Sequence, residues 1–251
     1  MLREERCGAV ARLTLDYPER RNALGMKMRV ALAEAFDRLE ADGSVRAVVL
    51  AGAAGTFCAG GDISEMNVSD IEGGRERFRL THRLVRLIIA SRMPVIAAVE
   101  GYAIGAGLSL ALCCDTIVGG AGAKFAAGFG RIGLIADLGM LHTLPRRVGE
   151  GRARQLLLYG EQMTAAEAER IGLIDAVVSD GEAVAAAMTW AERLTGAAAL
   201  PIGLTKTYFA AGLNETLEWE RTVQTMLFLT SDHAEGKAAF LEKRAPVFGR
   251  R

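Results

Sequence analysis

Residues 94–115 read PVIAAVEGYAIGAGLSLALCCD. The first part, 94–101, begins with a proline, continues as an apolar run to Val99 and ends in glycine after Glu100, a pattern typical of a strand buried on both faces of a sheet. The second part contains Gly105-Ala106-Gly107 followed by apolar residues, which predicts a helix soon after the strand. The stretch is therefore predicted to be a strand-to-helix junction, the repeating unit of an α/β fold.

The same alternation of strand and helix continues along most of the chain. We expect strands at 10–16, 45–52, 94–101, 115–120, 123–127 and 173–178, and helices at 26–42 and 72–91. In the first helix, Met28, Leu32 and Phe36 recur at helical spacing, which indicates one buried face. Strands that alternate with helices predict an α/β fold with mostly parallel pairing.

The last part of the chain shows only helical patterns. They cover 182–195, 200–212, 215–229 and 232–244. Capping-box spacing at Thr164 and Glu167, and at Asp232 and Glu235, predicts two of the helix starts. We divide the chain into a core at 1–195 and a helical region at 196–251, with the small residues before Pro201 as the joint.

Composition and charge exclude several classes of protein. The 251 residues contain 30 Lys and Arg against 30 Asp and Glu, so the chain lacks the basic surface of a nucleic-acid-binding protein. No window has the 18 or more apolar residues of a membrane span, and the charged N-terminus MLREERCGAV is unlike a signal peptide. The four cysteines and three histidines have no metal-site spacing. We expect a soluble cytoplasmic protein without a metal.

Two glycine clusters follow predicted strands. FCAGGDISEM, 57–66, comes after the strand at 45–52, and GYAIGAGLSLA, 101–111, comes after the strand at 94–101. Amides at a helix start have no partner within the helix and face the positive end of its dipole. Two such N–H groups that converge form an oxyanion hole, which stabilises negative charge on a carbonyl oxygen. Each cluster could also be a simple tight turn, and Asp62 is suited to cap the first one.

A third cluster, GFGRIG at 128–133, matches the dinucleotide-binding pattern GxGxxG. That pattern binds a dinucleotide only where it opens a helix after a strand. Here a loop is expected to follow, so we interpret the cluster as a glycine-rich loop.

RIGLIADLGML, residues 131–141, places one carboxylate, Asp137, in an apolar run. An ionised carboxylate removed from water is costly unless it is paired, and its pKa then rises. Asp137 is therefore either the N-cap of a helix that starts within DLGMLHTLP or a carboxyl group kept for proton transfer.

FCAGGDISEM, GYAIGAGLSLALCCD and RIGLIADLGMLHTLPRRVG, in this order, resemble the three signature segments of the enoyl-CoA hydratase/isomerase (crotonase) superfamily. RRNALG at 20–25, GLIDAVV and EGKAAFLEKRAPVF extend the likeness over nearly the whole chain. The resemblance implies a spiral of ββα repeats and a helical C-terminal region that builds homotrimers, often paired into hexamers. It also implies an acyl-CoA thioester as substrate and no cofactor beyond the coenzyme A of that substrate.

The resemblance also assigns roles to individual residues. The thioester oxygen would accept hydrogen bonds from the backbone N–H groups of Gly61 and Ala106. The expected contacts with CoA are Arg21, Ala23, Leu24, Ala59, Asp62, Ile63, Phe240 and Lys243. The last two would reach CoA across a subunit boundary, and lysine and arginine suit its phosphates.

The reaction depends on the acid/base groups. Hydratases of the superfamily carry two glutamates, which fall here on Ser109 and Phe129. Neither residue transfers a proton as a carboxylate does, and hydration needs a group to activate water and a group to protonate carbon. Asp137 matches the aspartate that dienoyl-CoA isomerases and ring-1,2-epoxyphenylacetyl-CoA isomerases use as a base. The chain most resembles the latter, so we expect a double-bond or epoxide isomerase with one aspartate base.

Other functions stay open at this point. One is a hydratase, hydrolase or dehalogenase that works through Asp137 and bound water. Another, of a different class, is a non-catalytic acyl-CoA binding protein, because both usual glutamates are absent. Phe129 at a glutamate position suggests an apolar, even aromatic, acyl group.

Overall fold

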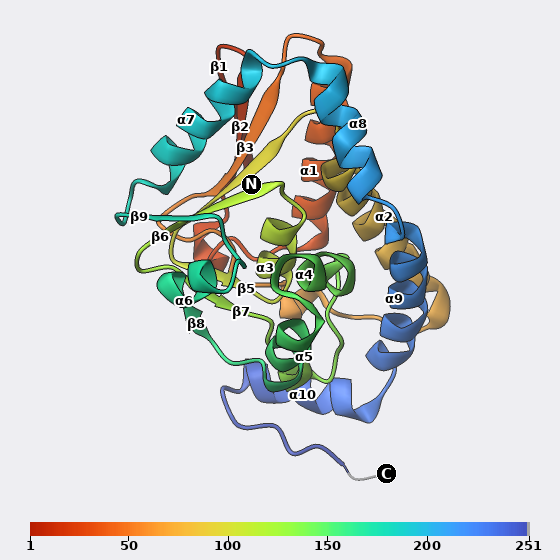
Figure 1. The fold of residues 1–251 in the computed structure, drawn as a ribbon. Coiled ribbons are helices and arrows are strands. Elements are labelled where there is room, and N and C mark those ends of the chain that lie inside the picture. The colour runs from red at the N-terminus through yellow and green to blue at the C-terminus, as the bar shows by residue number, and fades with distance from the viewer. Residues whose placement is uncertain (250–251) are drawn as a thin grey trace.

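A six-stranded sheet forms the centre of the structure, a computed structural model that describes residues 1–249 (Figure 1). Its strand order is β1 (Leu2–Cys7), β2 (Val10–Leu15), β3 (Ala47–Gly52), β4 (Val95–Val99), β6 (Thr116–Gly120) and β9 (Ala176–Val178). β1 pairs with β2 antiparallel, and all other neighbours are parallel. The predicted α/β class and mostly parallel pairing are confirmed.

A second, three-stranded sheet consists of β5 (Tyr102–Ile104), β7 (Lys124–Ala126) and β8 (Met163–Thr164). The chain passes from β4 in the large sheet to β5 in the small one, through helix α3 (Ala106–Leu112) to β6, and then back to β7. This alternation winds the chain into the spiral that the family resemblance implied. Sequence patterns missed β1, β5 and β8, because β1 is rich in charge and the other two are very short.

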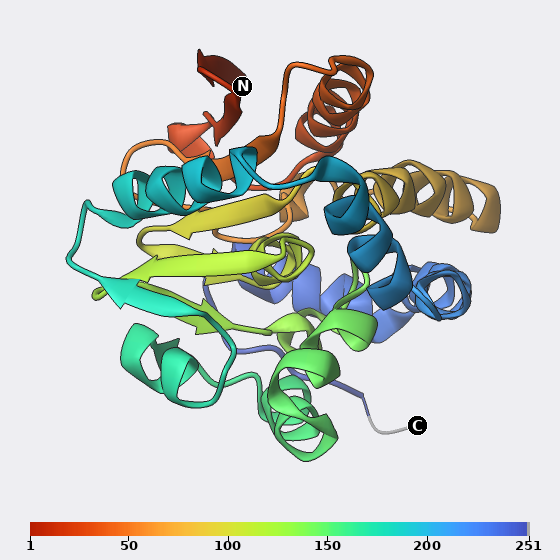
Figure 2. The same ribbon diagram turned by 45° about the horizontal axis from the view of Figure 1, so that its top comes forward.

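Helices cover both faces of the large sheet. In β3, Val48 and Leu50 point to the main core, which they share with helices α1 (Met26–Ala41) and α2 (Ile71–Ile89). Val49 points to the other face, where it packs against α7 (Ala183–Thr195), the helix that lies along the sheet in Figure 2. Burial on both faces explains why this strand is apolar throughout.

Most of the remaining helices agree with the predicted pattern, but α5, at 150–159, was not predicted. They are α4 (Met140–Val148), α5 (Glu150–Tyr159), α6 (Ala165–Arg170), α8 (Ala199–Phe209), α9 (Leu213–Phe228) and α10 (Ser231–Leu241), with short 3-10 helices η1 (Pro18–Arg20), η2 (Ile63–Glu65) and η3 (Phe129–Ile132). The capping box at Thr164 is present. The one expected at Asp232 is wrong: the N-cap of α10 is Thr230, two residues earlier, and its side chain accepts the His233 N–H. The GFGRIG cluster opens the short η3, followed by a loop, as expected.

The C-terminal helices lie against the spiral core. α9 packs along α2 and also touches α4, while α10 contacts η2 and η3. Both helices therefore border the segment 129–139 that contains Asp137. No helix within residues 1–249 is long and apolar enough to cross a membrane.

Gly107, in the first turn of α3, lies where the two glycine clusters meet. A Cβ added to Gly107 would stand 2.2 Å from the carbonyl oxygen of Cys58, which belongs to the backbone of the first cluster. A backbone atom cannot move aside as a flexible side chain can, so the clusters approach closely only because residue 107 is glycine.

We predict that Gly107→Ala lowers the free energy of unfolding by about 3 kcal/mol, because of overpacking against Cys58. Denaturant unfolding monitored by circular dichroism measures the change. The control is Gly151→Ala in α5, where an added Cβ meets nothing within 4 Å and alanine favours a helix by about 1 kcal/mol. Equal stability of Gly107→Ala and the wild type would contradict the prediction.

Candidate active site

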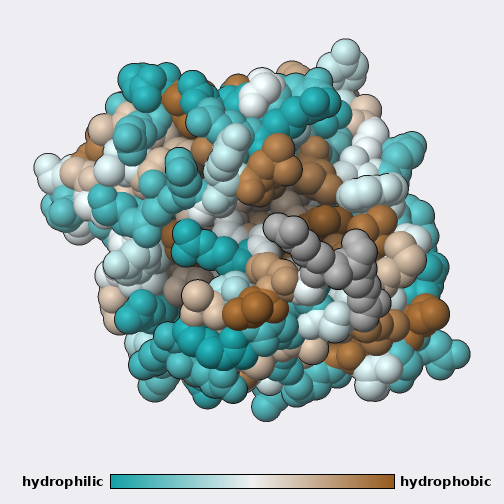
Figure 3. All heavy atoms as spheres, turned by 90° about the horizontal axis from the view of Figure 1, so that it is seen from below, coloured by the Kyte–Doolittle hydropathy of each residue, from teal (hydrophilic) through white to brown (hydrophobic). Residues whose placement is uncertain are grey.

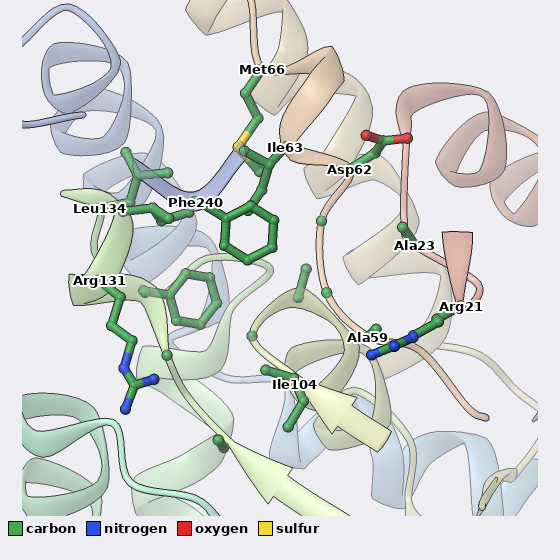
Figure 4. Close-up of a pocket in the computed structure, with 18 of the residues that line it drawn as sticks. Arg21, Ala23, Ala59, Asp62, Ile63, Met66, Ile104, Arg131, Leu134 and Phe240 are labelled. Carbon is green, nitrogen blue, oxygen red and sulfur yellow. The ribbon is translucent and has the colours of Figure 1, made fainter. Parts of the chain in front are cut away.

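A cavity of about 820 Å³ opens between the two glycine clusters, η3 and the end of α10. In Figure 4, Ile63, Met66, Leu134 and Phe240 lie on one side of it, and Arg21 with neighbouring residues lies on the other. The molecular face in Figure 3 is hollowed at its centre, where hydrophobic side chains gather within a hydrophilic surround. The cavity thus combines an apolar side with a polar side, as expected for a site that binds an organic ligand with a charged part.

Gly61 and Ala106 both line this cavity. A Cβ placed on Gly61 would lie 3.9 Å from the Ala106 Cβ, so the two residues are immediate neighbours. Within residues 1–249 neither backbone N–H has a hydrogen-bond acceptor. The first comes from the loop after β3 and the second from the start of α3. Two unpaired N–H groups at one cavity can stabilise a developing oxyanion.

Asp137 lines the same cavity and is buried. Its Oδ1 atom has no hydrogen-bond partner within the described chain. The alternative role as a helix cap is wrong, because α4 begins after Gly139 and no side chain caps it. The carboxyl group is therefore available to a ligand.

Two arginines lie near the Asp137 carboxylate. Arg29 of α1 is buried, with its Nη2 atom 4.0 Å from Asp137 Oδ2, too far for a hydrogen bond. Its other nitrogens donate to the Leu24 carbonyl at 3.1 Å and to Thr81 Oγ1 at 2.8 Å. Arg77 of α2 adds a second positive charge near Asp137.

Burial raises the pKa of Asp137 to about 7, and the negative charge of Glu220 contributes in the same direction. Arg29 and Arg77 act in the opposite direction and lower this pKa. Burial prevails because the carboxylate loses its hydration while neither arginine donates a hydrogen bond to it. Near neutral pH, Asp137 is therefore able both to accept and to donate a proton.

Helix α9 holds the segment that carries Asp137. Glu220 Oε1 accepts the Leu138 N–H at 2.9 Å, and Glu220 Oε2 accepts the Gly139 N–H at 2.8 Å. One turn later, Gln224 exchanges two hydrogen bonds with the backbone of Ile135. His82 Nε2 of α2 lies 2.7 Å from Glu220 Oε1 and completes this buried network.

The two positions at which hydratases carry glutamates have other roles here. Ser109 is fully buried in α3, where its hydroxyl donates to the Gly105 carbonyl at 3.3 Å, and it does not line the cavity. Phe129 does line the cavity and presents an apolar ring. Asp62 also lines it, but its Oδ1 accepts the Ser64 N–H at 3.0 Å, as predicted for a cap.

The structure brings most of the expected CoA contacts to the cavity. Those that line it are Arg21, Ala23, Ala59, Asp62, Ile63 and Phe240, whereas Leu24 is buried behind them and Lys243 lies in the turn after α10. Phe240 lines the cavity of its own chain, where α10 contacts η2 and η3. The expected contact with CoA across a subunit boundary stays a prediction. Arg20 and Arg21 provide positive charge for phosphate groups. Within residues 1–249, no group of three His, Cys, Asp or Glu side chains could hold a metal ion.

Sequence analysis missed the residues around Asp137, although a signal for them exists. Glu220 and Gln224 fall on the apolar stripe of α9 formed by Leu213, Leu217 and Phe228. Polar residues at such positions must find buried partners. Arg29 likewise shares the inner face of α1 with Leu32 and Phe36. The helical period therefore predicts that Glu220, Gln224 and Arg29 are buried, but it does not show that they lie near Asp137.

Comparison with known proteins gives one consistent family. The model of the enoyl-CoA hydratase/isomerase family matches residues 5–251. The 1,2-epoxyphenylacetyl-CoA isomerase of Escherichia coli is 37% identical over 95% of this chain and 94% of its own. A probable enoyl-CoA hydratase of Mycobacterium bovis is 36% identical over 99% of this chain and 96% of its own. The crystal structure of an enoyl-CoA hydratase from Mycobacterium avium subsp. paratuberculosis superposes with a TM-score of 0.89 at 32% identity, covering 99% of this chain and 98% of the other.

The raised pKa of Asp137 predicts a pH-dependent effect of Asp137→Asn on stability. A carboxyl group whose pKa is higher in the folded state stabilises the fold below its unfolded-state pKa, and this contribution is lost as the pH rises through the folded-state value of about 7. We expect Asp137→Asn to raise the melting temperature by several degrees more at pH 8 than at pH 5. Differential scanning calorimetry at both pH values measures this, and an equal change at both would contradict it.

Proposed function

This chain belongs to the enoyl-CoA hydratase/isomerase family, and we propose that it is an acyl-CoA isomerase with Asp137 as its single acid/base group. The observation that carries the proposal is the free Oδ1 of a buried carboxyl group that shares one cavity with two unpaired N–H groups. The name of the Escherichia coli relative supports the same reaction class.

The proposed reaction begins with the thioester oxygen bound to the N–H groups of Gly61 and Ala106. This polarisation makes the proton on the carbon next to the thioester more acidic, and Asp137 removes it. The resulting enolate carries its charge on the oxygen, where the two N–H groups stabilise it.

Two outcomes follow from the same enolate. In a 3-enoyl-CoA, the double bond moves to the 2,3 position and Asp137 returns the proton to the carbon two positions further along the chain. In a substrate whose ring epoxide adjoins the α-carbon, the enolate electrons instead form a double bond from the α-carbon to the adjacent ring carbon. The bond from that ring carbon to the epoxide oxygen breaks, and the oxygen keeps the electron pair and takes the proton from Asp137. A single carboxyl group serves the allylic shift, since the proton leaves and returns on one face.

The character of the cavity supports an apolar acyl group. Leu134, Met66 and Ile63 line the side away from Arg21, and Phe129 also lines the cavity. Such a surface favours a hydrocarbon or aromatic acyl chain through the burial of apolar area. The presence of Phe129 and Ser109 at the two glutamate positions favours isomerisation over hydration, even though several relatives are named as probable hydratases.

We also propose that the chain assembles into homotrimers or hexamers. Leu200, Leu204, Tyr208 and Phe209 of α8 are large apolar side chains that are mostly exposed in the single chain. A continuous exposed apolar area of this kind is typical of a subunit interface.

We expect Asp137→Asn to lower kcat for a 3-enoyl-CoA by about a thousand-fold, because amide nitrogen and oxygen do not accept the α-proton. The change in KM is expected to be small, since Asn keeps the size of the side chain. The assay follows the appearance of the conjugated 2-enoyl thioester by absorbance. Asp70→Asn is the matched control, because Asp70 caps α2 outside the cavity and asparagine also caps helices.

Near wild-type turnover of Asp137→Asn would overturn the single-base mechanism. Loss of the conjugated absorbance of crotonyl-CoA would favour a hydratase. Tight CoA binding without turnover of any 2-enoyl, 3-enoyl or epoxide thioester would favour a non-catalytic binding protein.

The pH dependence of catalysis follows from the same carboxyl group. The base must be ionised in the free enzyme, so kcat/KM is expected to rise with pH and to level off above about 7, the pKa of Asp137. A pH profile of the isomerase reaction measures this. An acidic limb near pH 4, the ordinary range of an aspartate, would contradict the proposed environment of the base.

A further inference from the structure

We propose that Glu220 positions the Asp137 base by accepting hydrogen bonds from the two backbone N–H groups that follow Asp137. This inference rests on the proposed function of Asp137. Glu220 belongs to α9 and is separated from Asp137 by more than eighty residues of chain.

The backbone after Asp137 adopts a conformation that its sequence does not favour. Leu138 has a φ of 51°, in the left-handed region that is costly for a residue with a branched apolar side chain. Gly139 follows with a φ of 73°. Such strain persists where surrounding interactions overdetermine it, and it is common at functional sites.

Glu220 supplies these interactions. Each of its oxygens accepts one N–H, from Leu138 at 2.9 Å and from Gly139 at 2.8 Å. Cys113 Sγ lies 3.5 Å from the Leu138 carbonyl oxygen, which belongs to the Leu138–Gly139 peptide. The Leu138–Gly139 peptide is therefore held at its N–H by Glu220 and at its carbonyl by Cys113. The Asp137–Leu138 peptide is held at its N–H by Glu220 and at its carbonyl by the Met140 N–H. Together these contacts fix the direction in which the Asp137 side chain leaves the backbone.

Glu220 is itself held rigidly. It is fully buried, and His82 Nε2 donates to its Oε1. A buried carboxylate is tolerated when its oxygens accept hydrogen bonds, and here three donors surround it. An alternative with no catalytic consequence is that Glu220 only stabilises the start of α4, where a negative charge is favourable.

The charge of Glu220 distinguishes the two roles. The groups near Asp137 come from three helices and from the end of a fourth: Arg29 of α1, Arg77 of α2, Glu220 of α9 and Cys113, the residue that follows α3. Among them Glu220 adds a negative charge, which raises the pKa of Asp137. A residue that only supports α4 would alter stability without altering the titration of the base.

The test compares Glu220→Gln with the wild type. Glutamine keeps the size but presents an NH₂ to one of the two N–H groups, and it removes the charge. We expect kcat to fall about a hundred-fold through misplacement of the base, with little change in KM. The acidic limb of kcat/KM is expected to move to lower pH by roughly one pH unit, because a like charge is removed.

Two further variants separate position from charge. Glu220→Asp keeps the charge but withdraws the carboxylate, so kcat is expected to fall while the acidic limb stays in place. Glu218→Gln is the matched control on the same helix, since Glu218 is exposed and pairs with Arg221. The Glu218→Gln variant is expected to leave both kcat and the acidic limb of kcat/KM unchanged. If Glu220→Gln does not fold, wild-type kcat in Glu220→Asp overturns the proposal, and a reduced kcat supports it.

A readout without turnover keeps this inference distinct from the proposed function. Carbon-13 NMR of carboxyl-labelled aspartates follows the titration of Asp137, whose signal is identified by its loss in Asp137→Asn. A lower pKa of this signal in Glu220→Gln supports the coupling, whether or not Asp137 is the base. Active Asp137→Asn refutes the proposed function. Inactive Asp137→Asn together with unchanged kcat and unchanged Asp137 titration in Glu220→Gln refutes the role of Glu220 alone.

Discussion

The cost of keeping the Asp137 carboxylate out of water is the constraint on which the site depends. A buried carboxylate without hydrogen-bond donors is unfavourable unless charges compensate it or it takes up a proton. Here Oδ1 has no partner within the described residues, and the nearest arginine nitrogen lies 4.0 Å from Oδ2. The compensation is incomplete, and the result is a carboxyl group that titrates near neutral pH. A protein selected for stability alone would favour an apolar residue at this position.

The surroundings of Asp137 come from parts of the chain that are distant in sequence. Arg29 belongs to the first helix and Glu220 to the ninth, and Asp137 lies between them in the chain. Neither residue forms a hydrogen bond with the Asp137 carboxylate. Arg29 affects the carboxylate through its charge, and Glu220 accepts a hydrogen bond from the adjacent backbone. The C-terminal helices thus contribute to the site as well as to the fold.

The two N–H groups of the proposed oxyanion hole could be predicted from the sequence because each is set by local structure. Each glycine cluster directly follows its strand, so the positions of Gly61 and Ala106 follow from a strand-to-helix junction. Their convergence is tertiary, yet it was expected because the family resemblance paired them. Gly107 shows why glycine is needed there, since any Cβ would overlap with Cys58. Phe240 shows the limit, because the sequence pattern does not reveal that α10 brings this side chain to the cavity of its own chain.

The sequence by itself determined the α/β class, most helices and strands, the two glycine junctions and the isolated carboxylate. These features depend on periodicity, on turn-forming residues and on interactions between near neighbours. Only the tertiary structure decided that Asp137 does not cap α4 and that Ser109 does not line the cavity. It alone placed Arg29 and Glu220 beside Asp137. The physical reason is that a helical period shows which residues are buried, whereas the pKa of a buried group depends on which charges the complete fold brings close to it.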